Sequence, residues 1–180
     1  MEKVITVKDK QFEIFINQAD VELNIGKIAA QMNVDLDGKH PIFVAVLNGA
    51  FMFASELMKE VSIPSEITFV RLASYEGTRS TNKVEEVLGL NESIKDRTVV
   101  VLEDIVDTGN TMISLINELS KHEPKEIKIA TLLLKPDALQ HPIRPDYVAL
   151  EIPSDFILGY GLDYDGYGRN LKDIYKIIEK

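Results

Sequence analysis

Residues 98–112 read Thr98-Val-Val-Val-Leu-Glu-Asp-Ile-Val-Asp-Thr-Gly-Asn-Thr-Met112. The run Thr98 to Leu102 is β-branched and nearly uncharged, which is typical of a parallel strand buried on both faces. Glu103 and Asp104 follow at its carboxyl end. Apolar residues then recur at helical spacing, at Met112, Leu115, Ile116 and Leu119. The segment therefore predicts a strand, a turn and a helix whose amino terminus, beside the sheet, is suited to binding an anion.

The turn and the two acids have a plain structural explanation and a chemical one. Asp107-Thr-Gly alone is an ordinary turn and helix N-cap. However, Glu103 and Asp104 are adjacent carboxylates with no basic neighbour in sequence. Because like charges repel, such a pair needs solvent, a metal ion or ligand hydroxyls around it. A phosphorylated sugar carrying Mg²⁺ would satisfy the acids and the turn together.

Composition indicates an intracellular enzyme domain. With 180 residues, of which 45% are hydrophobic, the chain is long enough for one sizeable core and short of two full domains. The net charge of −9 disfavours a general nucleic-acid-binding protein. There are no cysteines, so disulfides and cysteine metal sites are excluded. No apolar run reaches membrane-spanning length and no signal peptide is evident, so we expect a cytoplasmic protein without membrane contact.

The rest of the chain predicts an α/β fold. Strands are expected at Ile42–Leu47, Ser65–Leu72, Glu126–Leu134 and Pro145–Pro153. One helix is expected around Val21 to Met32 and another over Phe51–Lys59. A strand followed by a helix, taken three times between Ile42 and Leu134, favours a parallel sheet with right-handed crossovers. We expect a single domain over residues 1–180.

Four polar segments lie where strands are expected to end. Asn48-Gly49-Ala50 follows the first strand, and its small residues let backbone N–H groups approach an anion, although a plain turn has the same composition. Residues 73–97 are long for a connection and are either a lid or disordered. Lys135 is either a solvated strand end or a donor at the sheet edge. Residues 156–170, rich in aromatics and glycines, are either a packed loop or a base-binding segment.

The residues Val99 to Thr111 resemble the phosphoribosyl-pyrophosphate (PRPP) motif of type I phosphoribosyltransferases, and nearly the whole chain resembles the hypoxanthine-guanine branch of that family. The resemblance implies a parallel sheet of about five strands flanked by helices, at about residues 40–150. It also implies a small hood from the chain ends, at about 1–20 and 151–180, and a mobile loop at about 73–97. The activity implied is transfer of the phosphoribosyl group of PRPP to hypoxanthine, and to guanine, in purine salvage.

The resemblance assigns the PRPP half of the site. Glu103 and Asp104 are expected to hold the ribose hydroxyls, which chelate Mg²⁺. Asp107 is expected among the PRPP-binding residues and is the candidate general base for the purine nitrogen. The 5′-phosphate is expected on the N–H groups and hydroxyls of Thr108, Gly109, Asn110 and Thr111. Pyrophosphate is assigned to Asn48, Gly49 and Arg169. The family often has Lys or Arg in place of Asn48, and its peptide bond at Leu47-Asn48 is often cis.

The resemblance also assigns the purine half. Lys135 is expected to donate to the 6-oxo oxygen, Phe156 to stack on the base, and the backbone near Ile157 and Asp163 to bind the base edge. Asp163 is a further candidate ligand, for a second Mg²⁺, beside Glu103 and Asp104. Ser74 and Tyr75 match the lid residues that close over the phosphates, with Arg71 near the same edge of the sheet.

Three alternatives share parts of these motifs. A regulatory RNA- or DNA-binding protein on the same fold should present a basic face, against which the acidic composition argues. A xanthine- or uracil-directed phosphoribosyltransferase would share the PRPP half. An aspartic protease needs two Asp-Thr-Gly motifs in an all-β protein, and this chain has one. Small-molecule substrates, a homodimer or homotetramer, and no nucleic-acid partner are the expected associations.

Overall fold

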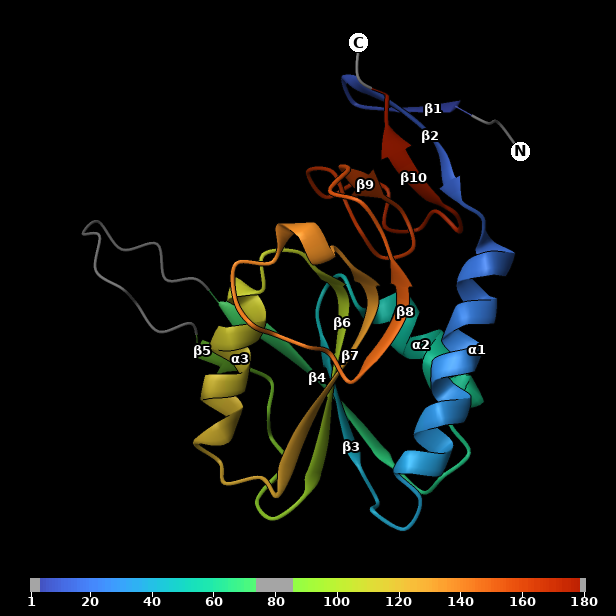
Figure 1. Ribbon diagram of the computed structural model, residues 1–180. Coiled ribbons are helices and arrows are strands. Elements are labelled where there is room, and N and C mark those ends of the chain that lie inside the picture. The colour runs from blue at the N-terminus through green and yellow to red at the C-terminus, as the bar shows by residue number, and fades with distance from the viewer. Residues whose placement is uncertain (1–3, 74–85, 179–180) are drawn as a thin grey trace, which may run out of the picture.

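A six-stranded sheet lies at the centre of the computed structural model, which describes residues 4–73 and 86–178 (Figure 1). Its strand order is β5-β4-β3-β6-β7-β8, and all neighbours are parallel except β5, which pairs antiparallel with β4. The parallel core therefore has five strands, as expected. The bounds are β3 Ile42–Val46, β4 Glu66–Ala73, β5 Glu86–Leu88, β6 Thr98–Val106, β7 Glu126–Leu134 and β8 Tyr147–Glu151.

Helices cover both faces of this sheet. The helices α1 (Gln18–Asp35) and α2 (Phe51–Glu60) lie on one face, and α3 (Asn110–Ser120) lies on the other (Figure 1). Alternate residues of one strand enter opposite cores: Val100 and Leu102 pack with α1 and α2, whereas Val99 and Val101 pack with α3. Such double burial explains why the central strands are continuous apolar runs.

A second, four-stranded sheet is formed by segments from both ends of the chain. Its order is β1-β2-β10-β9, with all pairs antiparallel. It lies beyond one end of the large sheet in Figure 1 and corresponds to the expected hood. A small core of Phe12, Leu158 and Tyr175 holds it together. Its strands are β1 Val4–Val7, β2 Lys10–Ile16, β9 Ile157–Leu158 and β10 Ile174–Ile177.

Strand β6 extends further than the sequence indicates, and this corrects the predicted position of the two acids. The apolar run ends at Leu102, but β6 continues to Val106, which pairs with Leu134 of β7. The other neighbour, β3, ends at Val46, and its last pair joins Ala45 to Leu102. Glu103 and Asp104 thus lie inside the strand, where β6 pairs with β7 but no longer with β3.

One further expectation about connectivity was wrong. Between Ile42 and Leu134 the described residues contain two strand–helix pairs, β3–α2 and β6–α3, and not three. After β4, residues 86–88 instead form the antiparallel edge strand β5. Strand β4 is buried on one face, at Thr68 and Val70, and exposed on the other, at Ile67 and Phe69. It therefore requires no second crossover helix to cover it.

Helix α1 contains one residue, Gly26, that does not suit a helix interior. Its buried face is Val21, Ile25, Ile28, Ala29 and Met32, and the Asn17 side chain caps its first turn. Gly26 lies in the interior of this helix, and nothing is within 4 Å of the place where a Cβ would stand. Gly26 therefore carries the entropic cost of glycine without a steric reason for it.

We expect Gly26→Ala to raise the free energy of unfolding by about 0.5–1 kcal/mol, because alanine restricts the unfolded chain and fits the helix. Urea unfolding followed by circular dichroism measures the change. Ala30→Gly is the matched control on the same helix, where the side chain is exposed. It should lower the free energy of unfolding by a similar amount, and a destabilised Gly26→Ala protein would contradict the prediction.

Candidate active site

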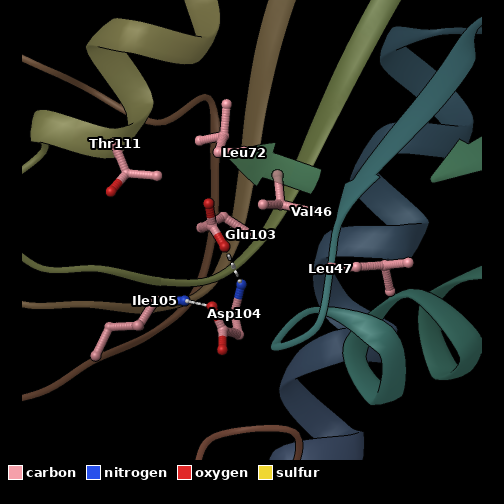
Figure 2. Close-up of a pocket in the computed structure, with 7 residues that line it drawn as sticks. All are labelled: Val46, Leu47, Leu72, Glu103, Asp104, Ile105 and Thr111. Atoms are coloured by element: carbon pink, nitrogen blue, oxygen red, sulfur yellow. Dashed lines mark hydrogen bonds between the residues drawn. The ribbon is translucent and has the colours of Figure 1, made fainter. Parts of the chain in front are cut away.

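Two adjoining cavities open at the carboxyl end of β6, beyond the last residue that pairs with β3. The larger, of 380 Å³, is lined by Val46, Leu47, Leu72, Glu103, Asp104, Ile105 and Thr111. Figure 2 shows Glu103 and Asp104 at its centre, with Thr111 on one side and Val46 and Leu47 on the other. The smaller cavity, of 170 Å³, shares Glu103, Ile105 and Thr111 and continues along the turn from Asp107 to Met112. The acids and the turn therefore open onto one continuous region.

The two carboxylates of this region are buried. Glu103 is 6% exposed and Asp104 is 9% exposed. Backbone N–H groups of Asp104 and Ile105 donate to Glu103 Oε1 at 3.3 Å and to Asp104 Oδ1 at 2.9 Å (Figure 2). Glu103 Oε2 is buried and accepts no hydrogen bond from the described residues. A buried carboxylate oxygen without a partner in the chain requires one from the cavity: ordered water, an ion or a ligand group.

Burial disfavours the charged form of both acids. It raises the pKa of the Glu103 carboxyl well above its ordinary range, and the neighbouring charge of Asp104 raises this pKa further. Burial raises the pKa of Asp104 too, although the charge of Arg169 acts in the opposite direction. The ligand-free protein therefore has an acidic pair that a hydroxyl-bearing, cation-carrying ligand would relieve.

This pKa shift predicts a pH-dependent stability. A folded-state pKa above the unfolded value means that the folded protein binds more protons, so stability falls as pH rises from about 4.5 through the folded pKa. We expect Glu103→Gln to flatten this decline and to be more stable than the wild type at pH 8. Urea unfolding of both proteins between pH 4.5 and 8 measures it. Parallel curves for the two proteins would show that Glu103 is not the group responsible.

The turn after β6 leads directly into α3. Gly109 precedes the helix with φ of +86°, a left-handed conformation that glycine adopts without strain, and Ile113 N–H closes the first turn on the Gly109 carbonyl. The N–H groups of residues at the start of an α-helix lack helical partners and face outward. Thr108, Gly109 and Thr111 line the smaller cavity, while Asn110 begins the helix.

Lys135 reaches this turn from the neighbouring strand. It follows β7, its side chain is 9% exposed, and its Nζ lies 2.8 Å from Asp107 Oδ2. The Asp107 side chain is 47% exposed, so the ion pair presents a solvent-accessible carboxylate backed by a buried ammonium. The structure thus brings together two residues that are 28 positions apart and that the sequence analysis placed at the same edge of the sheet.

The loop after β3 lies against the acids. The Leu47-Asn48 peptide bond is cis, as the family resemblance predicted. A Cβ built on Gly49 would overlap the Asp104 carboxylate, so only glycine allows this close approach. Arg71, at the end of β4, donates from Nη2 to Asn48 Oδ1 at 2.8 Å. A guanidinium therefore lies beside a loop position that itself has no charged side chain.

The carboxyl-terminal segment reaches the same loop from the small sheet. A Cβ on Gly161 would overlap the Gly49 carbonyl, so the two backbones are in contact. Arg169 donates to the Gly161 carbonyl at 2.7 Å and pairs with Asp163 Oδ1 at 2.6 Å. Asp163 Oδ2 accepts from Gly166 N–H at 2.6 Å. Asp163 and Arg169 thus share one site, and both Asp163 oxygens have partners within the chain.

The aromatic and apolar candidates of this segment differ in exposure. Phe156 is 45% exposed and makes an edge contact with Tyr164, at 5.8 Å between ring centroids. Ile157 is 5% exposed in β9, where its main chain pairs with Lys176. Ser74 and Tyr75, the predicted lid residues, lie outside the described part of the chain. A role in base binding for Phe156 and Ile157 stays a prediction.

Residues 4–73 and 86–178 contain neither a ready-made metal cluster nor a membrane-spanning helix. No group of three or more His, Asp or Glu side chains is placed to hold a metal ion, so Glu103, Asp104 and Asp163 do not form one such cluster. No helix in these ranges is long and apolar enough to cross a bilayer.

One neighbour of the turn was missed by the sequence analysis. His141 Nε2 lies 2.6 Å from Asn110 Oδ1. The only signal in the sequence is a histidine in a polar loop between two strands, Gln140-His-Pro142, which has no periodic or motif character.

Comparison with known proteins places this arrangement in a family. The model of the phosphoribosyl transferase domain matches residues 13–165. The chain belongs to the phosphoribosyltransferase family. The hypoxanthine-guanine phosphoribosyltransferase of Streptococcus thermophilus is 37% identical over 160 residues, covering 88% of this phosphoribosyltransferase and 89% of the relative. The hypoxanthine phosphoribosyltransferase of Salmonella typhimurium is 33% identical over 169 residues, covering 92% and 95%.

Solved structures agree with these matches. A hypoxanthine phosphoribosyltransferase from Staphylococcus aureus superposes with a TM-score of 0.85 at 32% identity, covering 92% of this phosphoribosyltransferase and 91% of the other chain. Bifunctional TilS/HprT proteins of Listeria are 35% identical over 160 residues, but the present chain spans 25% of their length. The fold and the family are therefore those of the hypoxanthine phosphoribosyltransferases.

Proposed function

We propose that this protein is a purine-salvage enzyme that transfers the 5-phosphoribosyl group of PRPP to hypoxanthine, and to guanine, releasing pyrophosphate. The observation that carries the proposal is the Asp107–Lys135 pair beside the buried acids Glu103 and Asp104, at the end of β6 that pairs with β7 alone. Full-length relatives named hypoxanthine phosphoribosyltransferase support the choice of base.

The PRPP half of the reaction uses three groups of residues. Breaking the bond from C1 of the ribose to the pyrophosphate oxygen develops oxocarbenium character in the sugar and negative charge on the leaving group. Glu103 and Asp104 hold the ribose hydroxyls, since these carboxylates line the larger cavity. The N–H groups and hydroxyls of Thr108 to Thr111 hold the 5′-phosphate at the start of α3. Asn48, Gly49 and Arg169 hold pyrophosphate: Gly49 contacts the backbone of Gly161, whose carbonyl accepts from Arg169, and Arg71 donates to Asn48.

The purine half of the reaction requires one group that accepts a proton from the base and another that donates a hydrogen bond to it. Asp107 accepts the proton of the attacking purine nitrogen, because its carboxylate is open to solvent beside the ribose cavity. Lys135 donates to the 6-oxo oxygen of the base. An adenine amino group would face this ammonium with its own hydrogens, so 6-oxopurines are preferred. Phe156 stacks on the base.

The residues fit Mg²⁺ through the substrate. Glu103 Oε2 is a buried oxygen without a partner among the described residues, and Asp104 is adjacent. Carboxylate oxygens and sugar hydroxyls are the hard ligands that Mg²⁺ binds, usually with several waters retained. When bound, Mg²⁺ offsets the charge of the pyrophosphate. Asp163 is the candidate for a second ion, in which case its contact with Gly166 or Arg169 would give way.

The deciding experiment incubates the protein with PRPP, Mg²⁺ and one base at a time: hypoxanthine, guanine, xanthine, adenine and uracil. Formation of inosine and guanosine monophosphates, followed by chromatography, is the expected result. Product with xanthine or uracil alone would replace the base assignment, and no product with any base would contradict the proposal. Light scattering of the same sample tests the homodimer or homotetramer that we propose.

A further inference from the structure

The segment between η1 (Pro136–Ala138) and β8 packs against the turn that precedes α3. Gln140 N–H donates to the Thr108 carbonyl at 3.0 Å. A Cβ on Gly109 would stand 2.7 Å from Ile143 Cδ1, so the Ile143 side chain, 7% exposed, covers the back of the turn. Residues 139–143 therefore support the turn at two successive positions, with a backbone hydrogen bond at Thr108 and an apolar contact at Gly109.

His141 adds a contact to the side chain at the third position. Its Nε2 lies 2.6 Å from Asn110 Oδ1. An amide oxygen only accepts hydrogen bonds, so this contact requires a hydrogen on Nε2, which both the imidazolium and one neutral tautomer provide. With Oδ1 engaged by His141, the Asn110 side chain has its two amide hydrogens left to donate.

The contact with His141 restricts the Asn110 side chain at the start of α3. Asn110 is the first residue of α3, between Gly109 and Thr111, which both line the smaller cavity. Its side chain is exposed, so without a partner it would sample several rotamers and lose entropy on binding a ligand. A hydrogen bond made before the ligand arrives removes part of this cost.

We propose that His141 is a positioning residue for the 5′-phosphate: it fixes the Asn110 amide so that its N–H₂ group faces the phosphate held by the turn. The inference rests on the proposed function. Loss of His141 should therefore weaken the binding of ligands that carry a 5′-phosphate and of no others. PRPP and the nucleoside monophosphate product carry this phosphate, whereas inosine and pyrophosphate do not.

The test compares dissociation constants of inosine monophosphate, inosine and pyrophosphate, measured by calorimetry, with steady-state kinetics for PRPP. For His141→Ala we expect a weaker affinity for the monophosphate and a higher KM for PRPP, each by roughly three- to tenfold, as for one partly lost hydrogen bond to a charged group. Affinities for inosine and pyrophosphate, and kcat, should stay within twofold of the wild type.

Three further variants separate positioning from a general structural effect. His141→Gln retains an N–H donor and should restore most of the monophosphate affinity. His122→Ala removes an exposed histidine beyond the other end of α3 and should change nothing. The double variant His141→Ala/Asn110→Ala should bind the monophosphate no more weakly than Asn110→Ala, because His141 acts through Asn110.

The outcomes distinguish this inference from the proposed function. If the wild type binds inosine monophosphate and inosine equally well, the turn is not a phosphate site and the proposed function is in error. If the wild type prefers the monophosphate but His141→Ala binds it normally, or if the two single effects simply add, the inference about His141 is overturned while the proposed function stands. Equal weakening for all three ligands would also overturn it.

Discussion

Asp107→Asn is expected to lower kcat by about 10²–10⁴-fold while the affinity for PRPP remains close to that of the wild type. Asparagine has nearly the same shape and can still accept a hydrogen bond from Lys135 Nζ, which now lies 2.8 Å from Asp107 Oδ2. It cannot take up the proton of the purine nitrogen. Single-turnover kinetics with hypoxanthine, beside calorimetric titration of PRPP, measures the two effects separately.

Asp137→Asn is the matched control for this prediction. It makes the same chemical change at an exposed aspartate two residues beyond Lys135 and should leave kcat unchanged. Wild-type turnover in Asp107→Asn would remove Asp107 from the mechanism. A loss of PRPP affinity equal to the loss of kcat would instead make Asp107 a binding residue.

The middle of the parallel core could be predicted because its central strands are buried on both faces. Ile42–Val46 is a continuous apolar run. Glu126–Leu134 ends in three leucines, and the structure gives this strand the predicted bounds. The buried face of α1 is the set expected from helical spacing. In these elements local periodicity and tertiary burial agree, so the sequence carries the information directly.

Elements determined by pairing over long distances could not be predicted in this way. The continuation of β6 through Glu103 and Asp104 depends on its register with β7, which is not visible in a stretch containing two acids. The edge strand β5 is short and pairs with only one neighbour, β4. Short, half-paired strands carry little pattern, because packing and not propensity stabilises them.

The same reasoning applies to the candidate site. Residues on the strand–turn–helix segment, such as Asp104 and Asp107, could be identified from the sequence because their chemistry lies on consecutive positions. Lys135, Arg71 and Arg169 could be assigned to the same site through the family resemblance, but the individual side-chain contacts between segments could not be predicted. Arg71 joins Asn48 and His141 joins Asn110 over 23 and 31 positions, and no periodicity links such pairs. Specific side-chain contacts between loops require coordinates.

Gly49→Ala is the second substitution for which we expect a large effect, and it tests the contact between the loop after β3 and the acids. A Cβ at this position would overlap the Asp104 carboxylate. Asp104 is a short, buried side chain held by Ile105 N–H at 2.9 Å, so it has little room to move without leaving its place in the cavity. We expect kcat/KM for PRPP to fall by at least about 10²-fold, because an ångström-scale displacement of a positioning group has consequences of this size.

Because Asp104 and the loop are the groups that must shift, the loss of activity should exceed the loss of stability. The carboxylate can relieve the overlap by swinging out of the cavity, which spares the core but removes a group that we propose holds the ribose. Circular dichroism and urea unfolding establish that the variant is folded, and initial rates over a range of PRPP concentrations give kcat/KM. Gly26→Ala is the matched control, since the same added methyl group meets open space there and should leave activity unchanged. A folded Gly49→Ala protein with wild-type kcat/KM would show that the close approach of the loop to Asp104 has no part in binding PRPP.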